Sequence, residues 1–319
     1  MKARRIILAG GTGFLGQLLA RHLAPLGWEP VVLTRSPDPN AAFRELAWDG
    51  RTVGEWARTL DGAAAVVNLA GKSVNCRYNA ENRHLIMSSR VDSTRAIGQA
   101  IAMCQQPPPV WLNAATATIY RHTPGPPHDE SSNDFTVTPE VKDEFSVEVA
   151  RAWERALNES STPRTRKVAL RTTLVFGTVE GGVFRILRRL ARLGLGGRMG
   201  RGDQFVSWIH EDDFCRAVEW ILGRPEFSGP VNLAAPNPLP NREMMAALRR
   251  TCGIRMGLPA AEWMLEIGAF LMRTETELLL KSRCVVPGKL LASGFEFRFA
   301  EFEQAVRDLE RRVQKADRS

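Results

Sequence analysis

The chain has 319 residues, 44% of them hydrophobic, and a formal net charge of +8 to which arginine contributes far more than lysine. This length can form one large or two modest cores, and because no run approaches about 18 consecutive apolar residues, we expect no membrane span. The five cysteines are scattered and form no C-x-x-C pair, which indicates a reduced, cytoplasmic protein without structural zinc. The arginines are dispersed and no basic motif interleaved with aromatic residues is present, so we expect no nucleic-acid partner.

The N-terminal segment carries the most specific pattern in the chain. A short apolar run at residues 5–9 precedes Gly10-x-x-Gly13-x-x-Gly16, and a helix-type stretch begins at Phe14. In a dinucleotide fold the first glycine permits the tight turn, the second lets the backbone approach a pyrophosphate, and the third lets the helix lie close to the strand. The phosphates lie at the helix N-terminus, where free N–H groups favour anions. We therefore predict a nucleotide-binding turn; the alternative is a glycine-rich turn without a ligand.

Strand-type and helix-type segments alternate through the first half of the chain. The predicted strands are 5–9, 30–34, 64–69, 110–114 and 167–174. The predicted helices between them are 14–26, 81–103 and 146–158. This alternation is typical of an α/β fold with a parallel, doubly wound sheet of the Rossmann type.

The second half of the chain predicts loops and helices. Residues 124–139 are polar and rich in proline, which indicates an exposed loop. We expect this loop to serve as an active-site flap. Residues 194–202 contain five glycines and are expected to form an ordered loop near the rim of a substrate cleft; the alternative is a low-complexity linker. Residues 225–240 form a second proline-rich connection with one strand at 230–233, and beyond Asn241 the chain is expected to be mostly helical, with a solvated helix near its end at 307–318. We expect a nucleotide-binding domain formed by residues 1–178 and 205–235. Residues 179–204 and 236–319 are expected to form a smaller, mostly helical substrate lobe.

The end of the second predicted strand indicates which cofactor is bound. In this fold an acid at that position binds the 2′-hydroxyl of NAD, whereas a nearby arginine accommodates the 2′-phosphate of NADP. Thr34 is followed by Arg35 and no acid stands at the tip, since Asp38 comes later. A guanidinium makes charge-assisted bonds to a phosphate, so the sequence favours NADP. The alternative for Arg35 is an ordinary surface arginine.

The third predicted strand ends in Asn68-Leu69-Ala70-Gly71. Small residues at this edge would let the backbone lie against the adenosine and the pyrophosphate. Asn68 could instead be a plain turn former. The position at the binding edge favours the cofactor role.

These features resemble the extended short-chain dehydrogenase/reductase superfamily, and most closely an atypical branch, the epimerase family with a C-terminal domain of unknown function. Further matching motifs are Ser89-Arg90-x-x-Ser93-Thr94-Arg95, Trp153-Glu154, the glycines of 194–202, Ser207-Trp208-Ile209-His210, and Val286-Pro287-x-x-Leu290 with Gly294-Phe295. The resemblance covers nearly the whole chain. It implies an NADP site lined by Gly10, Thr12, Gly13, Phe14, Leu15, Thr34, Arg35, Leu69, Ala70, Arg90 and Val175.

The acid–base pair of the wider superfamily is missing from this sequence. That superfamily uses Tyr-x-x-x-Lys together with a Ser or Thr, and the tyrosine moves a proton while the nicotinamide moves a hydride. Only Tyr78 and Tyr120 are present, and neither is followed by a lysine four residues later. The expected tyrosine and lysine positions fall near Ser146 and Ala150. Thr116 keeps the Ser/Thr position.

Three other side chains are candidates for the proton donor: Tyr120, His210 and Glu148. Each has an ordinary alternative. Tyr120 could be an aromatic residue at the edge of the core, His210 a hydrogen-bonded strand histidine, and Glu148 a solvated helix residue. The sequence therefore predicts an NADP(H)-binding reductase or epimerase with a non-standard proton donor, acting on a small molecule that it does not identify. The alternative is a non-catalytic NADP-binding sensor or partner-binding protein.

Overall fold

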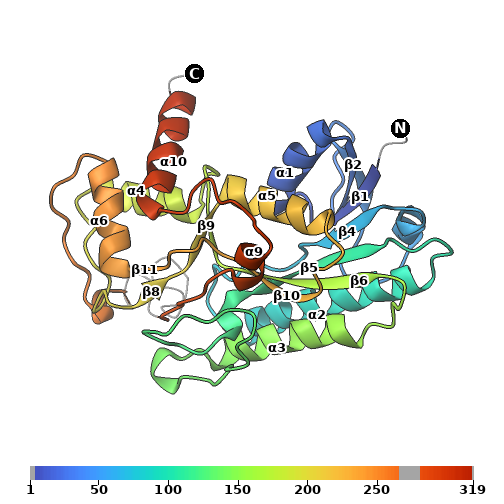
Figure 1. The fold of residues 1–319 in the computed structure, drawn as a ribbon, viewed down its shortest axis with the longest axis horizontal. Coiled ribbons are helices and arrows are strands. Elements are labelled where there is room, and N and C mark those ends of the chain that lie inside the picture. The colour runs from blue at the N-terminus through green and yellow to red at the C-terminus, as the bar shows by residue number, and fades with distance from the viewer. Residues whose placement is uncertain (1–3, 266–280, 318–319) are drawn as a thin grey trace.

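A seven-stranded parallel sheet forms the centre of the molecule (Figure 1). The computed structural model describes residues 4–265 and 281–317. The strands lie in the order β10-β6-β5-β4-β1-β2-β3, and their bounds are β1 (Arg4–Ala9), β2 (Trp28–Thr34), β3 (Arg44–Ala47), β4 (Ala65–Asn68), β5 (Val110–Thr116), β6 (Arg166–Thr172) and β10 (Gly229–Leu233). The order reverses between β1 and β4, and the crevice beside such a switch point, outside the carboxyl ends of the strands, is where ligands bind in open α/β sheets.

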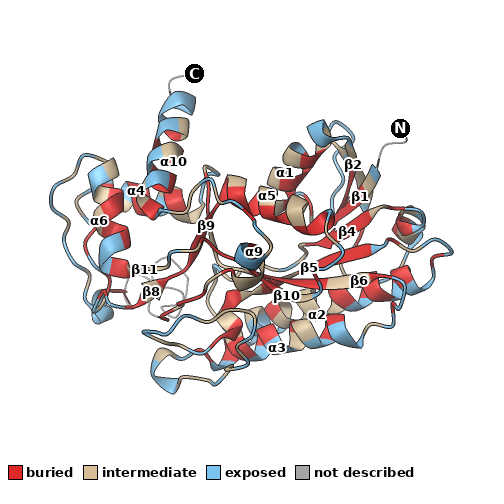
Figure 2. Cartoon of the chain, in the orientation of Figure 1, coloured by how far each residue is buried: buried red, intermediate tan, exposed pale blue. Residues whose placement is uncertain are grey.

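Both faces of the sheet are covered by helices (Figure 1). Successive side chains of a strand point to opposite faces, so Ile6 and Leu8 lie in one core and Ile7 and Ala9 in another. The first core includes α1 (Phe14–Leu23) and α5 (Glu211–Leu222), and the second includes α2 (Ala80–Ala102) and α3 (Glu144–Glu159). The central strands are consequently buried along most of their length (Figure 2). The predicted Rossmann-type fold is confirmed.

A third core joins the remaining elements beside the sheet. It contains side chains from α4 (Val183–Arg192), α6 (Asn241–Thr251) and α10 (Phe302–Ala316). Two short two-stranded sheets complete it, β7 (Leu174–Phe176) with β9 (Trp208–His210) and β8 (Phe205–Val206) with β11 (Leu239–Pro240). A short helix, α9 (Gly288–Ala292), precedes α10 in the chain. The division of the chain into two domains remains a prediction.

The predicted terminal helix is present as α10, but it is not solvated on all sides. Helix α10 buries Val306 and Leu309 in the third core, and Glu310 is only 4% exposed. The Glu310 carboxylate pairs with Arg188 of α4 at 2.6 Å. The many charged residues of this segment suggested a helix exposed to water. The helix is amphipathic, because some of its charges pair with a neighbouring helix and do not face water.

Two further differences concern the strands. The predicted strand 167–174 ends at Thr172, and the chain then enters β7, which pairs with β9 outside the main sheet. Strand β3 was not predicted, because Arg44–Ala47 has the sequence RELA and lacks β-branched or aromatic residues. None of the helices in the described ranges has the length and apolar character needed to cross a membrane.

Candidate functional site

The three glycines of the N-terminal turn have different structural roles. Gly10 has a φ of +71°, and a Cβ there would come within 2.8 Å of Ala70 Cα. A Cβ on Gly16 would lie 2.4 Å from Gly11 Cα, so Gly16 allows α1 to close on the turn. Gly13, by contrast, has a φ of −71° and a Cβ there would meet only Gly10 O, at 3.4 Å. Internal packing therefore requires Gly10 and Gly16, whereas the small size of Gly13 keeps the space above the α1 N-terminus open.

The N-terminus of α1 offers unpaired backbone donors at that space. Gly13 is the N-cap residue, no side chain caps the helix, and its first turn carries no acidic residue. Thr12 and Gly13 are exposed and Phe14 and Leu15 half-buried. A helix start of this kind favours an anion. The residues thus fit the diphosphate of a dinucleotide.

Arg35 follows β2 at the same edge of the sheet. Its side chain is exposed and, within the described part of the chain, makes no hydrogen bond or ion pair. Thr34 lies beside the glycine turn, with its Oγ1 3.4 Å from Thr12 Oγ1. The nearby acid Asp38 accepts a hydrogen bond from its own loop, at Asn40 N. Arg35 is therefore a cation available to a ligand phosphate, and Asp38 is engaged locally.

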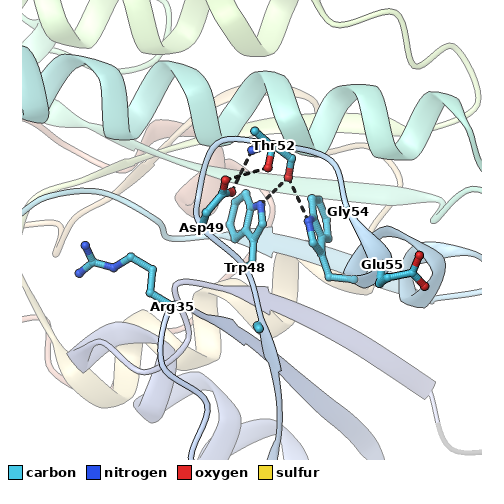
Figure 3. Close-up of a pocket in the computed structure, with 8 residues that line it drawn as sticks. Arg35, Trp48, Asp49, Thr52, Gly54 and Glu55 are labelled. Atoms are coloured by element: carbon cyan, nitrogen blue, oxygen red, sulfur yellow. Dashed lines mark hydrogen bonds between the residues drawn. The ribbon is translucent and has the colours of Figure 1, made fainter.

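A cavity of about 450 Å³ adjoins Arg35 (Figure 3). The residues that line it are Arg35, Ala47, Trp48, Asp49, Thr52, Gly54, Glu55 and Trp56. The indoles of Trp48 and Trp56 both donate to Thr52 O at 3.1 Å, which fixes one wall. Burial raises the pKa of Asp49, but hydrogen bonds from Thr52 and Arg51 outweigh this and hold it below its usual value. Apart from Arg35, these residues were not predicted to belong to the site, because the preceding strand β3 was itself not predicted.

Asn68 organises the turn after β4 from inside the protein. Its side chain is fully buried, donates to Asn113 Oδ1 at 2.8 Å and accepts from Ala70 N at 3.1 Å. Leu69 N donates to Ala9 O, which ties the turn to β1. Leu69 and Ala70 are half-buried at the same edge as the glycine turn. Asn68 therefore positions the backbone of its neighbours and does not itself face the edge.

Arg90 and Val175 lie farther along the same edge. Arg90 donates to Lys72 O and Ile86 O at 3.0 Å, and burial lowers its pKa to about 10. These bonds hold the loop that follows Ala70. Val175 is half-buried on β7, and a Cβ on the nearby Gly177 would come within 2.6 Å of the Phe14 ring. The end of β7 thus adjoins the first turn of α1.

Tyr120 is an internal residue in this structure. It is 2% exposed, and its hydroxyl donates to Asn232 Oδ1 at 3.0 Å and accepts from Arg171 at 2.8 Å. Arg171 in turn pairs with both carboxylate oxygens of Glu154, at 2.7 and 2.8 Å. Burial raises the pKa of Tyr120 above its usual value, against the opposite effect of Arg171. These contacts match the core-edge alternative for this tyrosine.

His210 caps a helix. It is fully buried, and its Nδ1 accepts from Asp212 N at 3.1 Å at the start of α5. Its ring stacks on Phe299 with centroids 3.9 Å apart. Burial lowers the pKa of His210 to about 4, so the ring is neutral at physiological pH. The hydrogen-bonded alternative describes it best.

Thr116 and Glu148 are the remaining candidates. Thr116 is half-buried at the end of β5, and its Oγ1 accepts from Thr118 N at 3.1 Å, which leaves the hydroxyl proton to be donated elsewhere. Glu148 is exposed on α3. Ala150, at the position expected for lysine, is buried beside Tyr120.

The two predicted loops, residues 194–202 and 124–139, have different surroundings. The 194–202 loop hydrogen-bonds to the C-terminal part, with Gly197 N donating to Leu258 O at 3.1 Å. The 124–139 segment is anchored at Glu130, whose carboxylate accepts from Asn232 N at 2.8 Å and from Lys289 N at 3.1 Å. This segment is therefore attached to β10 and to α9.

A segment that the sequence analysis did not assign to the site crosses beside Thr116. We call residues 281–286 the strap. Arg283 N donates to Phe205 O at 2.9 Å and Val286 N to His128 O at 2.9 Å, so the strap is held between β8 and the 124–139 segment. Arg283 Nε donates to Thr118 Oγ1 at 3.2 Å. The strap therefore brings a cation from the C-terminal part of the chain to the end of β5.

Known proteins match nearly the whole chain. The family model described as NAD dependent epimerase/dehydratase matches residues 6–234, and a domain of unknown function, DUF1731, matches residues 260–309. The epimerase family protein SDR39U1 of Bos taurus is 30% identical over 311 residues, covering 96% of this chain and 99% of its own. A crystal structure of the human epimerase family protein SDR39U1 with NADPH superposes with a TM-score of 0.84 at 28% identity, covering 96% of this chain and 99% of that one. A UDP-N-acetylglucosamine 4-epimerase from Bacillus cereus, at 19% identity and a TM-score of 0.76, shares the fold.

Proposed function

This chain belongs to the NAD dependent epimerase/dehydratase family, and from that premise we propose that it binds NADP(H) and acts as a reductase or epimerase with a non-standard proton donor. The observation that carries the choice of cofactor is Arg35, an exposed guanidinium without a partner in the described residues, at the end of β2. The 2′-phosphate is what distinguishes NADP from NAD, and arginine binds phosphate with charge-assisted hydrogen bonds. The human relative solved with NADPH supports the same choice.

The remaining contacts of the cofactor follow from the edge of the sheet. The open space at Gly13 and the N-terminus of α1 would hold the diphosphate. The cavity beside Arg35, with Trp48 and Asp49, would lie next to the adenosine. The turn at Leu69 and Ala70 would support the adenosine from the other side, and Val175 would lie towards the nicotinamide.

The chemistry at the other end depends on Thr116. When bound, the nicotinamide would supply or accept a hydride. Thr116 is suited to donate a hydrogen bond to a substrate oxygen, because Thr118 N already occupies one acceptor position of its hydroxyl. Tyr120 Oη and His210 Nδ1 are hydrogen-bonded inside the protein, and the buried His210 Nε2 lies 3.5 Å from Asp308 Oδ2 without a hydrogen bond, so we propose that neither side chain moves the proton.

The second candidate function is a non-catalytic NADP(H)-binding sensor. It is favoured by the same engaged side chains and by Ala150 in place of a lysine. General acid–base catalysis contributes about 10²- to 10⁴-fold in rate, so a site without it would turn over slowly. Binding of NADPH without oxidation by any carbonyl compound would support this second function.

The test of the cofactor site is Gly13→Val. We expect NADPH affinity to fall by at least about 100-fold, or ~2.7 kcal/mol, because the side chain fills the space for the diphosphate. The melting temperature should change little, since a Cβ at Gly13 meets no atom closer than 3.4 Å. Calorimetric titration with NADPH measures the affinity. Gly223→Val is the matched control, because Gly223 is exposed, has a φ of −79°, and lies at the far end of α5.

Equal NADPH affinity in the wild type and in Gly13→Val would contradict the assignment of the glycine turn. A matching loss in Gly223→Val would mean that the effect is general to adding a branched side chain.

A further inference from the structure

The C-terminal part of the molecule carries exposed apolar side chains that belong neither to a core nor to the candidate site. We call four of them, which are between 47% and 83% exposed, the lobe patch: Leu193, Leu195, Met256 and Leu258. Single apolar residues are ordinary on a protein surface, whereas a group of them on one surface indicates a site of interaction. The question is therefore whether these four residues lie together.

Backbone hydrogen bonds join the two segments that carry the lobe patch. Leu258 N donates to Gly194 O at 2.8 Å, and Gly194 stands between Leu193 and Leu195 in the sequence. Met256 precedes Leu258 by two residues on the same segment. The segment after α6 runs along the outer edge of the molecule, on the side opposite β1 and β2 (Figure 1). The four residues therefore belong to one surface, away from the proposed cofactor site.

The same two segments are strongly basic. Residues 182–202 and 244–261 contain nine arginines and no aspartate or glutamate. Five of these arginines pair with acids from outside the two segments: Arg185, Arg188, Arg192, Arg201 and Arg250. The other four have no acidic partner within the described ranges: Arg189, Arg198, Arg249 and Arg255. The surface that carries the lobe patch is therefore positively charged.

Two of the unbalanced arginines border the lobe patch directly. Arg189 stands four residues before Leu193 at the end of α4, and residues with this spacing lie on one face of a helix. Arg255 immediately precedes Met256. Both arginine side chains are exposed, and neither makes a hydrogen bond or an ion pair in the part of the chain that the structure describes. This arrangement fits a partner that offers negative charge above an apolar layer.

We propose that the lobe patch is a peripheral membrane-binding surface. Its four apolar side chains enter the headgroup layer of a bilayer, and the neighbouring arginines bind the phosphates of anionic lipids. Surface binding of this kind grows with the apolar area that is buried and with the attraction to anionic lipids. None of the described helices could cross a membrane, so the contact is confined to the bilayer surface.

Two other occupants fit the lobe patch less well. A second copy of the chain in a symmetric dimer would present the same patch, and the arginines of the two copies would then face one another. A nucleic acid would bind the arginines through its phosphates, but it would leave the four apolar side chains without an apolar partner. An anionic bilayer satisfies both the charges and the apolar side chains.

The test is flotation of the full chain with two kinds of vesicle, one of phosphatidylcholine alone and one of phosphatidylcholine and phosphatidylglycerol in equal amounts. We expect binding to the anionic vesicles to be at least about 10-fold stronger than to the neutral ones. Leu195→Ser combined with Leu258→Ser should weaken it by about 10-fold or more, because less apolar area is buried. Leu26→Ser combined with Met103→Ser is the matched control, because it removes two exposed apolar side chains elsewhere.

A second pair of variants tests the charges. Arg189→Gln combined with Arg255→Gln should weaken binding to the anionic vesicles by about 10- to 30-fold. Arg21→Gln combined with Arg155→Gln changes the net charge equally at exposed positions on α1 and α3, and should weaken binding by less than about threefold. Thermal melts check the fold of each variant. Where the leucine pair does not fold, Met256→Ser repeats the test at the most exposed residue of the lobe patch.

Failure of the wild type to bind the anionic vesicles would overturn the proposal, as would unchanged binding in the leucine pair. Equal losses in the two arginine pairs would also overturn it, because the attraction would then come from the net charge of +8 and not from this surface. A wild-type dimer that dissociates in the leucine pair would assign the lobe patch to a second copy. Binding of a DNA duplex that needs the two arginines but not the two leucines, in place of the vesicles, would assign it to nucleic acid. These measurements use no nucleotide, so their outcome is independent of the proposed cofactor.

Discussion

The two ends of the candidate site differ in what their polar side chains do. At the proposed adenosine end, Arg35 is exposed beside a cavity and has no partner in the described residues, and Gly13 leaves the start of α1 open. At the proposed nicotinamide end, Tyr120 is buried and hydrogen-bonded to the protein itself, and His210, the other predicted donor, is also buried and accepts a hydrogen bond at its Nδ1. Cofactor binding and proton transfer are therefore separable requirements: the groups proposed for the first are available to a ligand, whereas two of the predicted proton donors are hydrogen-bonded within the protein.

The largest effect is expected from breaking the ion pair beside the nicotinamide end. Lys281 Nζ lies 2.7 Å from Asp143 Oδ2, and both side chains are fully buried. Lys281→Met leaves the Asp143 carboxylate buried without a cation, and removing one partner of such a pair costs about 3–5 kcal/mol in unfolding free energy. Chemical denaturation measures this loss. The double variant with Asp143→Asn should recover most of it, because the amide is neutral and can still accept from Thr138 N. Equal losses in the single and double variants would show that the charge is not the cause.

The next effect is a pH dependence caused by His210. Its pKa is about 4 in the folded protein and near 6.5 in an unfolded chain. Above pH 6.5 the ring is neutral in both states and contributes no slope. As pH falls from 6.5 towards 4, only the unfolded state takes up the proton, so unfolding free energy should fall by about 3 kcal/mol.

His210→Asn should remove that part of the slope, because asparagine also caps helices. His84→Asn, at an exposed position on α2, is the matched control and should retain the slope. An unchanged slope in His210→Asn would mean that the ring is not held neutral as its contacts indicate.

The smallest effect on stability is expected from Tyr120→Phe. It leaves Arg171 and Asn232 each without one buried partner, which costs about 1–3 kcal/mol. If Tyr120 only stabilises the fold, any oxidation of NADPH by the protein should keep its rate within about threefold, far from the 10²- to 10⁴-fold loss expected for a proton donor. Thermal melts and the absorbance of NADPH measure both quantities. A large loss of rate with unchanged stability would make Tyr120 the donor.

The contrast between the two ends also explains what the sequence could predict. The sheet and the glycine turn follow from local patterns, since alternating apolar strands and three spaced glycines need only their own neighbours. Arg35 could be placed because it directly follows a recognisable strand. Asp49 could not, because β3 has the sequence RELA and gives no strand signal.

The nicotinamide end depends on contacts between residues far apart in the chain. Tyr120 meets Arg171 and Asn232, and Lys281 meets Asp143, across separations of 51, 112 and 138 residues that no local pattern encodes. Periodicity could not show that these polar groups satisfy one another. For this reason the sequence left several proton donors open, whereas the structure shows the hydrogen-bond partners of Tyr120 and of His210 Nδ1 and leaves Glu148 exposed.

The most direct test of the central claim compares NADPH and NADH affinities of the wild type and of Arg35→Ala at two salt concentrations. Loss of the hydrogen bonds to a charged phosphate, worth about 1.5–3 kcal/mol, should weaken NADPH binding by about 10- to 150-fold. NADH lacks the phosphate, so its affinity should stay unchanged, and Arg44→Ala, an exposed arginine of β3, should affect neither. Added salt should weaken NADPH binding more in the wild type than in Arg35→Ala, because it screens a solvent-exposed ion pair. Equal losses for both cofactors, or no loss for either, would contradict the account.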